Sequence, residues 1–417
     1  MPQLIETLLN RIIELISEMK DPKNNEKDSV LNQKYQKSLE SLCRQTTNFQ
    51  LDPPYEVCDY NTRLIVEENV WTVSNYLTEM TDTKNPLTML ECANIMEEAL
   101  LGSIRIEASC MGNVGEDEAL KVADVLRDKF LTKSRMLSDE QTPRFRSLKI
   151  PTFEETKLLF DDNDVTYPIV YEELARAEME DNNAIELYLQ VGQDQNMKYE
   201  GIAILDLIAH IAYTSAFNTL RTQEQLGYIV STYPRNTAGG THGLTIVIQS
   251  SSKLPSELEE RCEAWLVAFR EELANLSEDM VAMEAGAVVA QLLERDTRLG
   301  QEIDKMWSQI IGTECLSSKD REPVFGRLEK LAATIDVDDE DNAVTAADIK
   351  RKMLDMFDQH LAPSAPMRRA LSSRVYGQSS KEAFESNADK SGILQGRDDA
   401  RDLKLSLGSW PIKPYWK

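Results

Sequence analysis

The chain has 417 residues, of which 41% are hydrophobic, and this length and apolar content predict two domains with a core each. Its 71 acidic and 46 basic residues give a formal net charge of -25, so its surface repels phosphate backbones and anionic lipid headgroups. We therefore expect neither nucleic acid nor a membrane as a partner.

Cysteine usage indicates a reducing compartment, and the N-terminal segment does not have the pattern of a signal peptide. The six cysteines include no Cys-x-x-Cys pair, so we expect free thiols and a cytoplasmic location. Glu6, Arg11 and Glu14 interrupt the first apolar run at helical spacing, which predicts an amphipathic core helix and not a signal peptide. No stretch approaches the roughly 20 apolar residues of a membrane span.

Helical periodicity dominates the first half of the chain. Helices are predicted at residues 1–19, from Lys34 onward, and at 56–80, 86–101 and 117–130. Alternating apolar and polar residues predict a strand at 104–111, and weaker patterns predict strands at 144–150, 156–160 and 168–172. The charged stretch 175–183 has no strand pattern, so we place the domain boundary there.

The second half alternates strands and helices. Strands are predicted at 185–191, 227–233, 243–250 and, more weakly, 367–376; helices are predicted at 200–220, 255–273, 277–297, 300–311 and 346–360. Asn236, Gly239 and Gly240 predict a hairpin connection between two of the strands.

The two halves share an order of elements, in which helices are followed by a terminal strand. We therefore predict an α+β fold of two related α/β domains, residues 1–175 and 176–417, each with an antiparallel sheet packed against several helices. The first half has no counterpart of the front strands of the second. Its domain is therefore expected to be incomplete.

Several common catalytic motifs are absent from the sequence. No two of the histidines, His210, His242 and His360, lie one helical turn apart, so a zinc-binding His-x-x-Glu-His motif is excluded and we expect this chain to bind no metal. There is no Gly-x-Ser-x-Gly elbow and no glycine-rich phosphate loop. The acidic run 336–341 lacks the pattern of a calcium loop.

The segment FNTLRTQEQLGYIV, residues 217–230, carries the strongest chemical signal. Phe217 and Arg221 are four residues apart on one helix face, and Gly227 allows the tight turn that places Tyr228 on the next strand. A guanidinium and a phenol held together can stabilise an oxyanion. The alternative interpretation is structural: Arg221 complements the helix dipole, and Tyr228 is an ordinary strand aromatic.

This segment, with GLTIVIQSS that follows it, resembles the C-terminal half of the insulin-degrading enzyme family of pitrilysin-type inverzincin peptidases. Three further segments resemble that family in the same order: YQKSLESL, IRIEASCMGNV and IELYLQVG. The resemblance covers most of the chain and weakens after about residue 361.

The resemblance implies a fold and a division of labour. Members have four related domains in two halves that close around a peptide, and the zinc with its His-x-x-Glu-His ligands belongs to the first domain. Residues 1–175 would then be the third domain without its front strands, and 176–417 the fourth. Arg221 and Tyr228 match the residues that approach the scissile carbonyl, and Phe217 matches a substrate-pocket aromatic.

Three interpretations stay open at this point. The chain is the substrate-chamber half of a zinc endopeptidase, inactive without a zinc-bearing N-terminal half, and acts on peptides. Alternatively, it is a non-catalytic scaffold or binding protein of the same fold, or a truncated gene product, because missing front strands would leave a sheet edge unpaired. Retention of both Arg221 and Tyr228 favours the first.

Overall fold

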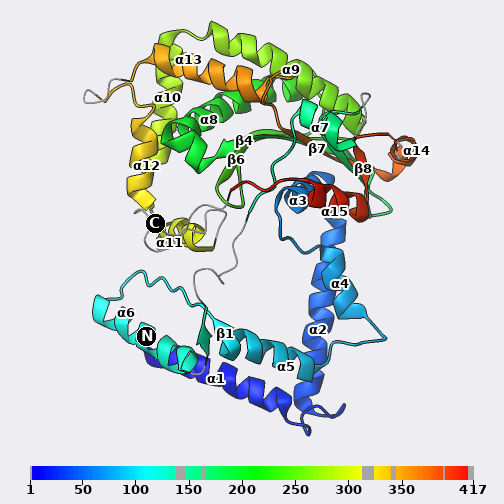
Figure 1. Cartoon of the computed structure of the whole chain (residues 1–417), viewed down its shortest axis with the longest axis vertical. Coiled ribbons are helices and arrows are strands. Elements are labelled where there is room, and N and C mark those ends of the chain that lie inside the picture. Colours follow the sequence, from blue (N-terminus) through cyan, green and yellow to red (C-terminus); the bar gives the residue numbers. More distant parts are fainter. Residues whose placement is uncertain are drawn as a thin grey trace. The chain divides into compact units, whose positions relative to one another are not determined.

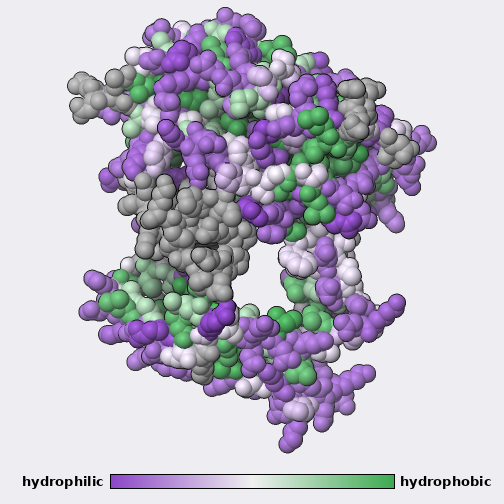
Figure 2. Space-filling view, in the orientation of Figure 1, coloured by the Kyte–Doolittle hydropathy of each residue, from purple (hydrophilic) through white to green (hydrophobic). Residues whose placement is uncertain are grey.

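The computed structural model describes residues 2–132, 134–137, 146–160, 165–311, 324–339, 344–387 and 390–411. The chain divides into two compact units. Unit 1 comprises Met1–Leu51, Trp71–Pro143 and Thr297–Trp307, and unit 2 comprises Asp52–Val70, Arg144–Asp296 and Ser308–Lys417. Hydrophilic residues dominate the face of each unit seen in Figure 2, as the net charge leads one to expect.

Unit 1 is built mainly from helices (Figure 1). They are α1 (Pro2–Lys20), α2 (Val30–Asn48), α4 (Val73–Thr81), α5 (Met89–Glu97) and α6 (Glu116–Leu126), and α11 (Leu299–Ile311) begins in this unit. Ser29, Thr72 and Thr88 each cap a helix N-terminus by accepting a hydrogen bond from a backbone N–H in its first turn. Met19 and Met89 lie in a small core between α1 and α5.

The strand predicted at 104–111 is mostly wrong. Only β1 (Ser103–Ile104) forms, and it pairs in parallel with the two residues of β2 (Arg135–Met136). Residues 105–111 have no regular secondary structure. A strand needs a neighbour for its backbone N–H and C=O groups, and β2 offers only two residues of pairing, so the alternating pattern alone does not produce a longer strand.

Unit 2 is organised around a six-stranded sheet with the order β5-β6-β4-β7-β3-β8. The strands are β3 (Ile169–Leu174), β4 (Asn183–Gln193), β5 (Ile229–Thr237), β6 (Thr241–Ser250), β7 (Ala370–Tyr376) and β8 (Ile393–Gln395). The predicted hairpin joins β5 to β6, and Gly239 and Gly240 in its turn have φ of 76° and 69°, which glycine adopts readily. The predicted α+β class is confirmed. The sheet is mixed, however, since β3 runs parallel to β7 and β8, whereas only antiparallel pairing was predicted.

Helices cover both faces of this sheet (Figure 1). One face carries α8 (Asp194–Ala216), α9 (Pro255–Asn275), α10 (Glu278–Leu292), α12 (Val324–Ala333) and α13 (Ala346–Met356), which share one large core with β4 and β6. The other carries α3 (Pro54–Val66) and α15 (Arg397–Ser406), whose Ile65 and Leu403 pack against Tyr171 and Leu371. Two layers of helices therefore bury the sheet between them.

Helix α8 continues as the π-helical turn η5 (Phe217–Gln223). By length and composition the stretch Asp194–Gln223 could cross a membrane, contrary to the prediction that no stretch approaches a span. Its apolar residues, including Leu205 and Ile208, are buried against the sheet, which is the packing of a core helix. Lys198 has a left-handed φ of 55°, and the regular helix follows it, close to the predicted start at 200.

Another predicted strand, 156–160, is wrong, because these residues lie in helix α7 (Phe153–Phe160). The missed signal is Thr152 followed by Glu155. The Thr152 N–H donates to the Glu155 carboxylate, and the Glu155 N–H donates to the Thr152 hydroxyl, which is the reciprocal arrangement of a capping box.

Part of the predicted strand 144–150 lies outside the described residues, and within the described part only isolated bridges form, at Ser147 and Leu148. The assignment of 1–175 and 176–417 to two family domains stays a prediction. Strand β3 comes before residue 175 in the sequence, but in the structure it pairs with β7 in the sheet of unit 2.

Candidate functional site

The candidate site lies where α8 continues as η5 and the chain then enters β5. One side of this helix is fixed by burial, because Ala212, Ala216 and Leu220 are fully enclosed in the core of unit 2. The other side carries Tyr213, which is exposed, and Phe217, which is half-buried. The core contacts therefore determine which side chains face outward.

The turn that follows η5 is held by several hydrogen bonds. The Glu224 N–H donates to the Thr219 carbonyl at 2.9 Å, and the Leu226 N–H donates to the Leu220 carbonyl at 3.0 Å. The Glu224 carboxylate accepts two hydrogen bonds of 2.7 Å from the Arg261 guanidinium on α9. These contacts anchor the end of the helix to its neighbour, as an ion pair with bidentate geometry can.

Gly227 is required at the point where the chain meets the sheet. A Cβ atom at this position would lie 1.8 Å from the carbonyl oxygen of Gln249 on β6, so no larger residue fits without moving the backbone. Ile229 then pairs with Gln249 as the first residue of β5. Tyr228 lies between Gly227 and Ile229 in the sequence, and 85% of its surface is exposed.

The structure brings the three predicted site residues together. The Cζ atom of Arg221 lies 4.5 Å from the ring centroid of Phe217 and 5.1 Å from that of Tyr228. Both distances are typical of cation–π contacts. The guanidinium therefore contacts two aromatic rings, one from the helix and one from the entry to the strand.

Arg221 has no hydrogen bond or ion pair within the described ranges of the chain, whereas many other arginines of unit 2 pair with carboxylates. Its N–H groups can therefore donate to a ligand. Arg221 also lies in the last turn of η5, where a positive charge suits the helix dipole. Arg221 can thus complement the helix dipole and also donate hydrogen bonds to a ligand.

Sequence reasoning missed one member of this group. The Tyr213 ring lies 6.4 Å from the Phe217 ring, centroid to centroid, with the planes inclined by 34°. The available signal was its spacing, because Tyr213 precedes Phe217 by four residues, just as Phe217 precedes Arg221. We refer to Tyr213, Phe217, Arg221 and Tyr228 as the aromatic–arginine stack.

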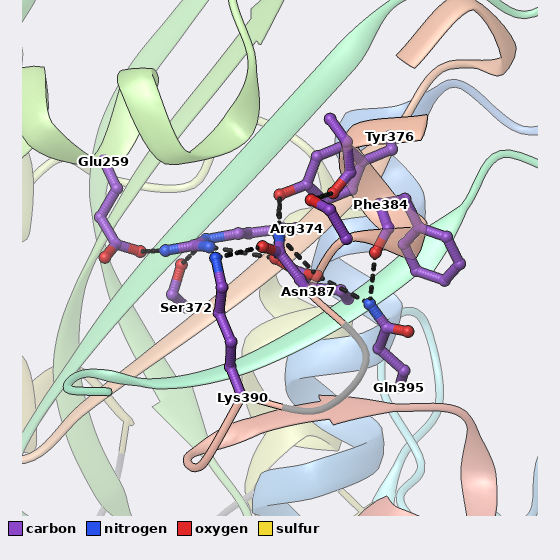
Figure 3. Close-up of polar contacts among 11 residues, drawn as sticks. Glu259, Ser372, Arg374, Tyr376, Phe384, Asn387, Lys390 and Gln395 are labelled. Atoms are coloured by element: carbon purple, nitrogen blue, oxygen red, sulfur yellow. Dashed lines mark hydrogen bonds and ion pairs between the residues drawn. The ribbon is translucent and has the colours of Figure 1, made fainter. Parts of the chain in front are cut away.

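A second polar cluster surrounds Arg374 on β7 (Figure 3). Arg374 forms ion pairs with Glu172 at 3.1 Å and Glu259 at 3.0 Å, and Glu172 accepts further hydrogen bonds from Tyr376 and Asn387. Burial acts to lower the pKa of Arg374, but Glu259 and the other anionic neighbours raise it, so the guanidinium stays charged. Since the charges are buried and paired, this cluster is a structural network.

The histidines do not form a metal site in the part of the chain that the structure describes. His242 contacts the Asp194 carboxylate through Nε2, and His210 Nε2 lies 3.3 Å from Glu284. Burial lowers the pKa of His360 and so favours its neutral form. Among the described residues no group of three His, Cys, Asp or Glu side chains could hold a metal ion. Zinc therefore does not fit the residues observed here.

Comparison with known proteins shows what this chain is similar to in sequence and in fold. A family model described as "PQQ synthase PqqF-like, C-terminal lobe domain 4" matches residues 207–307, which include the aromatic–arginine stack. The structure superposes on that of pitrilysin with a TM-score of 0.68 and 18% identity, covering 93% of this chain and 36% of that one. This likeness shows a shared fold.

The chain is also similar in sequence to curated proteins. The chain is 29% identical to human insulin-degrading enzyme over 68% of its length, and 26% identical to the Arabidopsis thaliana protein "Insulin-degrading enzyme-like 1, peroxisomal" over 89%. It spans only 26% and 34% of these two relatives. The chain is thus similar in sequence to a part of the insulin-degrading enzymes, and its residues 207–307 match a C-terminal lobe domain.

Proposed function

We propose that this chain is the substrate-contacting half of a zinc metalloendopeptidase that degrades peptides, and that it acts together with a zinc-bearing N-terminal half. The observation that carries the proposal is the aromatic–arginine stack, in which Arg221 lies against Phe217 and Tyr228 with its N–H groups free to bind a ligand. Homology to insulin-degrading enzymes supports a peptide as the substrate.

The two polar groups of the stack suit the chemistry of amide hydrolysis. When water attacks a peptide carbonyl, negative charge develops on the carbonyl oxygen, and hydrogen-bond donors already in place stabilise it more than they stabilise the ground state. The Arg221 guanidinium and the Tyr228 hydroxyl are such donors. Phe217 offers an apolar surface to a substrate side chain, and its contact with Arg221 restricts where the guanidinium can lie.

The metal would come from the partner half, because the described residues of this chain supply no ligand set for it. When bound there, zinc supplies an activated water. The role of this chain is then to bind the peptide and to orient its carbonyl group. We also propose a cytoplasmic location, with which the free thiols of the described cysteines are compatible; Cys315 lies outside the described residues.

A complementation assay tests the proposal. The chain is mixed with a separately produced N-terminal half of human insulin-degrading enzyme, and cleavage of an internally quenched peptide is followed. We expect cleavage that requires both halves, and we expect Tyr228→Phe and Arg221→Ala each to lower kcat by about 100- to 1000-fold, the usual effect of losing one oxyanion donor.

Tyr76→Phe is the matched control, because Tyr76 is an exposed tyrosine of unit 1 outside the stack. It should leave kcat unchanged. Cleavage that survives both Tyr228→Phe and Arg221→Ala at the wild-type rate would contradict the proposal. Peptide binding without cleavage in the mixture would instead favour a non-catalytic binding protein.

A further inference from the structure

We propose that Tyr213 extends the candidate site by one helical turn and, with Phe217, binds an aromatic or large aliphatic side chain of the peptide. This inference rests on the proposed function, because it assigns a specificity-determining residue to the same site. It concerns a side chain that neither the motif nor the comparisons single out.

The first argument is position. Tyr213, Phe217 and Arg221 follow one another at four-residue intervals, so they line one face of the helix. The π-helical turn η5 begins at Phe217, and extra residues of this kind in a helix are frequent at functional sites. The face therefore continues without a break from the Arg221 guanidinium to the Tyr213 ring.

The second argument is exposure. Tyr213 is 51% exposed, although the residues beside it, Ala212 and Ala216, are completely buried. The helix thus turns two small alanine side chains toward the core and the large ring of Tyr213 outward. Exposed aromatic rings gathered at one place are typical of binding surfaces, since tyrosine offers a large rigid contact area at a low entropic cost.

The third argument is the division of the stack into a polar and an apolar end. Arg221 and Tyr228 offer N–H and O–H donors, whereas Tyr213 and Phe217 offer two inclined rings 6.4 Å apart. Aromatic rings pack favourably in such offset or inclined pairs, and a third apolar side chain can join them. The apolar end should therefore take a side chain, and the polar end a peptide carbonyl.

The spacing predicts where along the peptide this preference falls. The Cζ atom of Arg221 lies 4.5 Å from the Phe217 ring centroid, and the two ring centroids are 6.4 Å apart, so the midpoint between the rings is at most about 8 Å from the guanidinium. An extended peptide advances about 3.3 Å per residue. The preferred aromatic residue should thus lie about two positions from the carbonyl that Arg221 contacts.

A pair of peptides tests the inference on the full chain alone. Two fluorescein-labelled decapeptides of the same serine and alanine background differ only in having Phe or Ala at the fifth position, and binding is measured by fluorescence anisotropy. We expect the wild-type chain to prefer the Phe peptide by about tenfold, the scale of a good aromatic contact.

The variants separate this preference from general binding. Tyr213→Ala should abolish the preference by weakening the Phe peptide about tenfold while leaving the Kd of the Ala peptide unchanged, and Tyr213→Phe should keep it. Tyr76→Ala is the matched control, because Tyr76 is 52% exposed and lies in unit 1; it should change neither Kd.

Two results would overturn the inference by different routes. If the Phe preference persists in Tyr213→Ala, or if this variant weakens both peptides equally, Tyr213 does not determine specificity, whereas the proposed function stands. If the wild-type chain binds neither peptide, the peptide-contacting role fails, and the inference fails with it.

Discussion

Replacing Arg374 by methionine should destabilise unit 2 strongly, because it leaves two buried carboxylates without a counter-charge. Glu172 is 0% exposed and Glu259 is 8% exposed, and both pair with Arg374 in the wild type. Removing one partner of a buried ion pair costs about 3–5 kcal/mol. Tyr376 and Asn387 still donate hydrogen bonds to Glu172, so we expect the lower end, about 3 kcal/mol.

Urea unfolding followed by circular dichroism measures this loss. With an m-value of about 3 kcal/mol/M, the midpoint should fall by about 1 M.

The controls isolate the buried charge. Arg401→Met removes an exposed arginine that pairs with Asp398 and Asp402, and it should cost about 0.5 kcal/mol or less. Adding Glu172→Gln and Glu259→Gln to Arg374→Met should restore most of the lost stability, since no unpaired charge then remains. A loss in Arg374→Met no larger than that in Arg401→Met would refute the reasoning.

Two further predictions concern the strand that follows the site and the centre of the sheet. Gly227→Ala should lower the free energy of unfolding by about 2–4 kcal/mol and weaken peptide binding, because the added Cβ would lie 1.8 Å from the Gln249 carbonyl oxygen. Urea unfolding measures the first effect and fluorescence anisotropy the second. Curves of this variant that match those of the wild type would contradict the prediction. Burial raises the pKa of Glu186 to about 7, above its usual 4.5, despite the nearby Arg235. The protonated carboxyl therefore contributes up to about 3 kcal/mol to the free energy of unfolding below pH 4.5, and this contribution is lost as pH rises through 7. Glu186→Gln should flatten this pH dependence, and urea titrations of the two proteins that run parallel from pH 4.5 to 8 would show that Glu186 does not cause it.

The sequence predicted best those features that depend on residues close together in the chain. Phe217, Arg221 and Tyr228 span a single helix-to-strand turn, so their spacing alone predicted their proximity, although their chemical roles stay a proposal. The hairpin at Gly239 and Gly240 was predicted correctly for the same reason, since its turn chemistry is local.

The failures came from tertiary contacts and from an overlooked cap. An alternating pattern at 104–111 predicted a strand, but pairing depends on a neighbour that the pattern does not report. At 156–160 a capping box at Thr152 and Glu155 outweighed the apparent strand pattern. The network around Arg374 joins residues far apart in the chain, so no local signal could have predicted it.

The path of the chain through unit 2 also determines when this unit can fold. Helix α3 packs on β4 and on β7, and β7 follows it about 300 residues later in the chain. At about 5–20 residues per second a ribosome needs about 15–60 s to supply that strand. Until then Ile65 and Val66, which are buried in the finished protein, lack Leu371 as a packing partner. The core on this face of the sheet therefore cannot be completed before β7 has been synthesised.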